Sequence, residues 1–182
     1  MNSLQKKRKL FEYLVYLLEE WRKEKYPNYN EKFTKLKLQK ILFLVSSYKA
    51  TIHCHPLLDI FNNFYACTWG PVEMDIYESM CNSNFEFIIF ENNDCVLKNN
   101  IEDVKKDADD ELIELMECLK NTINEIKESE VDYITVGGFD LVNIVQKWSC
   151  WKVSMRTTEI LNQQIEQITT KEICESRCKP WK

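Results

Sequence analysis

The only two histidines of the chain, His53 and His55, flank a cysteine in one short segment. Imidazole and thiolate groups are zinc ligands, but a structural zinc site takes four ligands in two spaced pairs. This segment supplies one half of such a set, and Cys67 or Cys81 could complete it, although the spacing specifies neither. The alternative is a solvated loop before Pro56. We favour the loop, with no resident metal or cofactor expected.

Other reactive residue types form incomplete patterns. Cys174 and Cys178 lie on one face if the last helix reaches them, but they supply only a half-site. Glu73, Asp75 and Glu78 could act as paired carboxylates, whereas acids in the first turn of a helix also complement its dipole. A nucleophile needs a base and an orienting group, and nothing in the sequence specifies such a set. Phosphate-binding glycine loops and zinc-protease motifs are missing. We therefore predict a protein that is not an enzyme.

Basic residues are concentrated in the first 50 positions, which hold 12 basic and 5 acidic residues. The remaining positions hold 12 basic and 24 acidic residues, and the net charge is -5. Nucleic-acid binding would have to use the basic region, because an acidic protein repels phosphate at long range. A solvated helix face, which we favour, or a protein partner of opposite charge explains the pattern equally well. The residues concerned are Lys6, Lys7, Arg8, Lys9, Lys32, Lys35, Lys37 and Lys40.

The N-terminal segment has some features of a signal peptide, because Lys6–Lys9 precede the apolar stretch Leu10–Leu18. Glu12 interrupts that stretch, and no small-residue cleavage site follows. No run of about 18 apolar residues could cross a membrane. The eight cysteines lie in a chain long enough to fold without disulfides. We expect reduced thiols and a cytoplasmic protein.

The elements that position these residues follow from length and pattern. With 182 residues, 45% hydrophobic content, 3 Gly and 4 Pro, the chain favours one domain, residues 1–182, that is rich in helices. Apolar spacing predicts helices over 4–25, from an N-cap at Thr34 to about Tyr48, and over 107–127. Further helices are expected over 141–148 and 158–173.

Strands are expected where aromatic and β-branched residues form short runs. Residues 64–69 read as a strand that enters a Gly70-Pro71 turn, with Pro71 opening a helix that extends to Met80. Residues 85–98 read as a hairpin around a polar turn. The predicted fold is α+β, a mainly α-helical single domain with a small antiparallel β-sheet.

Two stretches of the sequence resemble motifs of the Panacea domain family, which includes SocA-like antitoxins and phage-associated GepA-like proteins. One is the helix Leu36–Phe43, and the other runs from Phe64 to Val72 with Tyr77 five residues further on. A weaker match ends at Trp151-Lys152, so the resemblance covers about 33–152. The matching residues are Leu36, Leu38, Gln39, Lys40, Phe64, Ala66, Trp69, Gly70, Pro71, Val72, Tyr77 and Trp151.

The sequence departs from the family pattern at several of these places. Cys67 stands where the family usually has Trp, Trp69 replaces Tyr, and Met74 replaces a frequent Pro. Val145-Gln146 stands where a Thr-His pair is usual, so any chemistry of that pair is absent from this chain. Cys150 replaces a Pro. Each matched residue also has a structural interpretation as a turn or core residue.

The resemblance implies an antitoxin that binds a toxin encoded beside it on a prophage or mobile element, and that neutralises the toxin or delivers it to proteolysis. Trp69, Tyr77 and Lys37 are the predicted protein-binding residues, whereas Gln39 and Lys40 read as ordinary exposed helix residues. A DNA-binding phage regulator that uses the basic N-terminal helices is the first alternative, and a metal-binding domain with His53 and His55 is the second. No membrane contact is expected.

Overall fold

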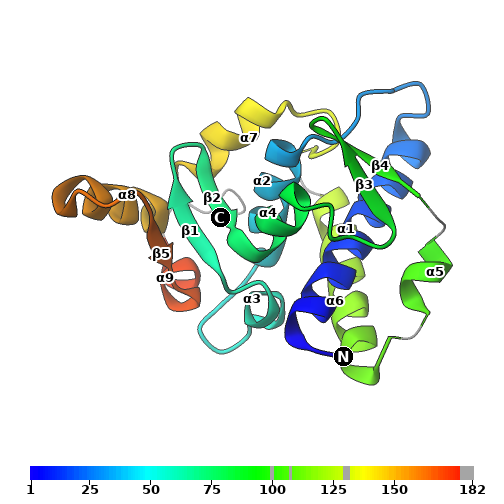
Figure 1. The fold of residues 1–182 in the computed structure, drawn as a ribbon, viewed down its shortest axis with the longest axis horizontal. Helices are drawn as coiled ribbons and strands as arrows, with labels where there is room; N and C mark the ends of the chain where they lie inside the picture. Colours follow the sequence, from blue (N-terminus) through cyan, green and yellow to red (C-terminus); the bar gives the residue numbers. More distant parts are fainter. Residues whose placement is uncertain (99–100, 107, 129–131, 177–182) are drawn as a thin grey trace.

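A computed structural model describes residues 1–98, 101–106, 108–128 and 132–176 (Figure 1). The described chain is a mostly helical α+β fold, which confirms the predicted fold class. One antiparallel sheet has the strand order β2-β1-β5, and the other is the hairpin β3-β4. The helices are α1 Ser3–Lys25, α2 Lys35–Ser46, α3 Pro56–Ile60, α4 Met74–Cys81, α5 Ile101–Lys105, α6 Asp110–Lys127, α7 Gly138–Val145, α8 Ser149–Leu161 and α9 Thr170–Glu175. The strands are β1 Phe64–Cys67, β2 Gly70–Glu73, β3 Ile88–Glu91, β4 Asp94–Leu97 and β5 Glu166–Ile168.

Helix α2 lies at the centre of the fold, with α1, α4, α7 and the β1–β2 hairpin around it (Figure 1). Thr34 caps its N-terminus by accepting a hydrogen bond from the backbone N–H of Lys37, as predicted. Every residue from Lys37 to Ser46 is buried. Helix α1 is likewise buried without interruption from Leu10 to Leu18. Two helices covered on several sides therefore form the middle of the core, which Trp148 extends by packing edge-on against Phe43.

The structure corrects the prediction that Pro71 opens a helix. Pro71 lies in strand β2, opposite Ala66 of β1, and α4 begins only at Met74. The hairpin turns at Thr68-Trp69, before the predicted position. Because β2 is an edge strand, a proline there need not cost the sheet a ladder hydrogen bond.

The C-terminal prediction of one helix over 158–173 is wrong. Helix α8 ends at Leu161, and Asn162 adopts the left-handed conformation that commonly ends a helix. Strand β5 follows and pairs with β1, with Ile168 opposite Phe64. The helix predicted over 141–148 also ends early, since α7 stops at Val145 and Trp148 is the N-cap of α8.

The remaining predictions hold with small changes of boundary. The predicted helix over 4–25 is α1, and the predicted hairpin over 85–98 is β3–β4. Helix α6 begins at Asp110, with Asp109 as its N-cap, while position 107 lies outside the described residues. The short helices α3 and α5 were not predicted. Across the described residues, no helix combines the length and apolar character needed to cross a membrane.

Candidate functional site

Six of the twelve residues that carry the family resemblance line one groove of about 380 Å³: Leu36, Gln39, Lys40, Trp69, Val72 and Tyr77. The groove lies between α2, the β1–β2 hairpin and the start of α4, so segments separated by some thirty residues along the chain face each other. Its lining is mostly apolar or aromatic, with one cationic group at the rim and one at the floor. The lining residues are Lys35, Leu36, Gln39, Lys40, Cys67, Trp69, Val72, Met74, Tyr77 and Asn93.

The tip of the β1–β2 hairpin is held in place from α7 and α8. The indole N–H of Trp151 donates to the carbonyl of Cys67 at 3.0 Å, and the side-chain amide of Gln146 donates to the carbonyl of Thr68, also at 3.0 Å. These bonds tie two carbonyls at the turn to helices that are far away in sequence. The orientation of Trp69, which follows in the turn, is thereby restricted.

Gly70 lets the hairpin approach α2 and α7 closely. Its φ is +92°, a conformation that side chains with a Cβ rarely adopt. A Cβ at this position would lie 2.6 Å from Cγ2 of Val145 and 3.4 Å from Nζ of Lys40. Glycine is therefore required for two independent reasons, backbone conformation and space.

Lys40 is buried at the floor of the groove, which corrects the prediction of an exposed residue. Its ammonium donates to the carbonyl of Pro71 at 2.7 Å. Among the described residues, no carboxylate lies within ion-pair distance of it. Burial lowers the pKa of Lys40 to about 7, and the Cys67 thiol opposes this change. Burial also raises the pKa of Cys67, against the influence of Lys40.

Gln39 was also predicted to be exposed, but its side chain is buried. Its amide accepts from the backbone N–H of Glu73 at 3.0 Å and donates to the carbonyl of Glu73 at 3.3 Å. The amide thus pairs with the end of β2 as another strand would.

The Glu73 carboxylate caps α4 through the N–H of Ile76 and pairs with the buried ammonium of Lys7. Burial raises the pKa of Glu73, while Lys7 opposes the increase.

Of the three predicted protein-binding residues, two are exposed. Trp69 is 57% exposed and Tyr77 is 43% exposed, and both line the groove. Phe139 of α7, 65% exposed, meets the Trp69 ring edge-on at 5.7 Å and was not identified from the sequence. Lys37 is buried instead, and its ammonium donates to the carbonyl of Ile134 at 2.6 Å. Lys37 therefore fixes the segment before α7 and offers no charge to a partner.

The other matched residues have structural roles. Leu38, Phe64 and Ala66 are completely buried in the core.

A second group of exposed apolar residues lies away from the groove, on α8 and the loop that follows it: Val153, Ile160, Leu161 and Ile165. Figure 1 shows α8 extending to the side of the molecule.

The basic N-terminal region is not the solvated positive face that we favoured. Lys6 forms ion pairs with Asp109 and Glu111. Lys7 is buried between Glu73 and Asp75. Lys37 and Lys40 of α2 are also buried. The ion pairs of α1 and this burial together reduce the positive surface available to phosphate groups.

The histidine segment lies apart from the groove. His53 is exposed, and Nδ1 of His55 lies 3.0 Å from a carboxylate oxygen of Asp59. Within the described part of the chain, no group of three or more His, Cys, Asp or Glu residues could hold a metal ion. Cys174 is half-buried in α9, whereas Cys178 lies outside the described residues.

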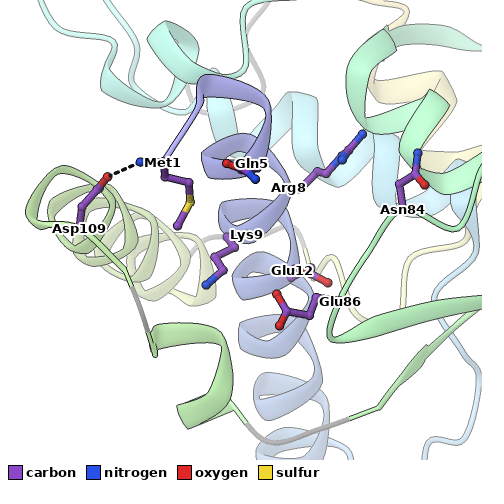
Figure 2. A pocket seen from close by; sticks show the side chains of 8 residues that line it. All are labelled: Met1, Gln5, Arg8, Lys9, Glu12, Asn84, Glu86 and Asp109. Carbon is purple, nitrogen blue, oxygen red and sulfur yellow. Dashed lines mark ion pairs between the residues drawn. The ribbon is translucent and has the colours of Figure 1, made fainter.

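A larger pocket, of about 520 Å³, lies beside the first half of α1 (Figure 2). Most of its charged groups have partners within this chain. Arg8 donates to the hydroxyl of Ser79, and Lys9 donates to the carbonyl of Lys106. Figure 2 shows Arg8 and Lys9 directed to opposite sides of the helix, so these cations do not converge on one point. Glu12 accepts a hydrogen bond from the backbone N–H of Phe87.

Comparisons with protein-family models, with curated proteins and with solved structures give no match for this chain. Its resemblance to the Panacea domain family stays a prediction from the sequence motifs. The groove is therefore the structural feature from which a function can be proposed.

Proposed function

We propose that this chain is a non-enzymatic, antitoxin-like protein that binds a segment of a partner protein in the groove between α2, β1–β2 and α4. The observation that carries this proposal is the pair of exposed aromatic residues that line the groove, Trp69 and Tyr77, with the exposed ring of Phe139 packed against Trp69. Large aromatic side chains dominate the energetics of protein interfaces, and exposed apolar patches mark interaction sites. The hydrogen bonds of Trp151 and Gln146 keep the hairpin tip in position before a partner arrives.

The family resemblance supplies the partner class. It implies a toxin encoded beside this protein on a prophage or mobile element, which is either neutralised directly or delivered to a protease. Free thiols are found at Cys54, Cys67, Cys81, Cys95, Cys118 and Cys150, which fits the cytoplasm as the site of action.

The test is growth of cells that express the product of the adjacent gene, with and without this protein. We expect toxicity that is relieved by wild type and not by Trp69→Ala. Truncating an aromatic hot-spot residue costs about 2 kcal/mol or more, which is on the order of a 30-fold loss of affinity. Ile160→Ala is the matched control, because Ile160 is an exposed apolar residue away from the groove. Full relief by Trp69→Ala would contradict the proposal.

The DNA-binding alternative is separated from this proposal by its salt dependence. A protein that neutralises phosphates loses affinity steeply as salt is added. We expect no duplex binding at low salt, because the basic region is largely paired or buried within the chain. Tight, salt-sensitive binding would favour a regulator instead.

A further inference from the structure

The floor of the groove contains the buried amine of Lys40, which has no carboxylate partner among the residues that the structure describes. The Lys40 side chain is completely buried, yet the groove reaches it. An ammonium group has three N–H donors, and the described residues account for one hydrogen bond, to the carbonyl of Pro71. No described carboxylate pairs with it.

Another buried lysine, Lys7, differs from Lys40 in having carboxylate partners within the chain. Lys7 is also buried, and it contacts the carboxylates of Glu73 and Asp75. A buried charge is costly unless it is paired and hydrogen-bonded. Lys7 meets this requirement within the chain, whereas Lys40 has no carboxylate partner among the described residues and is one of the residues that line the groove.

We propose that the groove binds a partner segment that combines apolar side chains with a carboxylate, and that this carboxylate pairs with the ammonium of Lys40. The inference rests on the proposed function and specifies the chemistry of the partner. Apolar side chains of the segment pack against Trp69 and Tyr77, which line the groove above Lys40. The shared chemistry is the carboxylate, which an Asp or Glu side chain or a chain terminus can supply.

The groups around the groove favour an anion there. Lys35 is the charged residue at its rim, and Cys67 and Tyr77 are the other titratable residues of its lining. The pKa of Tyr77 is raised, chiefly by Cys81, and that of Cys67 is raised by burial, so both groups stay neutral near pH 7. Val145 of α7 contributes an apolar contact beside Gly70. Glu73 is engaged by Lys7.

This chemistry makes binding dependent on pH. The pKa of free Lys40 is lowered to about 7, and a bound carboxylate stabilises the protonated amine and raises that pKa. Binding is then strongest below pH 7. It weakens by up to about tenfold per pH unit above that value, until the pKa of the bound state is reached.

The first experiment uses 4-phenylbutyrate and its amide, which share a ring and chain and differ in charge. NMR of the ¹³Cε resonance of Lys40 reports its titration in the wild-type protein. We expect phenylbutyrate to raise the pKa of Lys40 and to shift resonances of Trp69, and the amide to do neither. Equal effects of acid and amide, or no effect of the acid, would overturn the inference. This comparison uses only the wild-type protein, so its outcome does not depend on whether a variant folds.

The second experiment selects peptides from a random library, displayed with free C-termini and also within a carrier loop. We expect apolar peptides with a carboxylate on wild type, and loss of the carboxylate preference on Lys40→Met. Enrichment of Asp or Glu in the loop format identifies a side chain as the source, and enrichment only with free C-termini identifies a chain terminus.

The selection separates the two proposals. Apolar peptides that need Trp69 but show no preference for a carboxylate would overturn this inference and leave the proposed function standing. If no enriched peptide depends on Trp69, the proposed function fails as well. Lys40→Met is matched in length and keeps the floor of the groove filled without the charge.

Discussion

We predict that Glu12 makes the folding stability of this protein depend on pH. The side chain is buried in α1, where one carboxylate oxygen accepts a hydrogen bond from the backbone N–H of Phe87 at 2.7 Å. Figure 2 shows it in the pocket beside Glu86. Burial raises its pKa from 4.5 to about 7, and the backbone hydrogen bonds oppose the increase only in part. The ionised form of Glu12 is therefore disfavoured by folding.

The sign and size of the effect follow from this difference. Between pH 4.5 and about 7 the unfolded chain releases the proton of Glu12 before the folded chain does, so stability falls as the pH rises through this window. Each pKa unit is worth about 1.4 kcal/mol, so the carboxylate costs on the order of 3 kcal/mol above pH 7. Glu12→Gln removes the charge and keeps an oxygen that can accept from Phe87.

Urea unfolding of wild type and Glu12→Gln at about pH 5 and about pH 8 measures the effect. We expect the variant to be more stable by on the order of 3 kcal/mol at the higher pH, with a much smaller difference at the lower pH. Glu20→Gln, at an exposed position of the same helix, is the control and should change little. An equal difference at both pH values, or no stabilisation near pH 8, would refute the reasoning.

Two further predictions concern stability around the groove. Gly70→Ala should lose about 2–5 kcal/mol, from an unfavourable φ together with overpacking against Val145. Adding Val145→Ala should not recover the backbone part, and thermal unfolding that shows a loss under about 1 kcal/mol for Gly70→Ala would contradict this. Lys7→Met should lose about 3–5 kcal/mol near pH 8, because it leaves the Glu73 carboxylate buried and unpaired. Since protonation removes that charge, the loss should shrink in acid, and the double variant with Glu73→Gln should recover most of it. A loss independent of pH would argue against this account.

Local signals predicted much of the fold. The cap at Thr34, the apolar positions of α1 and α2, and the polar turn of the β3–β4 hairpin each depend on a few neighbouring residues. The β1–β2 hairpin shows where this approach failed, because Gly70-Pro71 has the composition of a turn while the pairing of Cys67 with Gly70 places the turn earlier. Strand register is decided by the partner strand and the packing beneath it.

Only some residues of the candidate site could be predicted from the sequence. Trp69 and Tyr77 were expected at a surface, and the structure places both at the groove. Phe139 of α7 contacts Trp69, and Gln146, the residue after α7, donates to the carbonyl of Thr68 in the same hairpin. The local sequence around Phe139 and Gln146 does not indicate these contacts. Contacts of this kind depend on how helices pack together.

The sequence by itself determined the helices α1, α2 and α6 and the β3–β4 hairpin, because caps, turns and apolar periodicity act over a few residues. Only the tertiary structure decided which lysines are buried and which are exposed. Lys7, Lys37 and Lys40 are buried, and their acceptors lie 66, 97 and 31 residues away in the chain. A helix that is covered on several sides has no polar face to mark its exposed positions, so a buried cation and a solvated one have the same local pattern. The difference between them is the distant acceptor, which only the folded chain brings within reach.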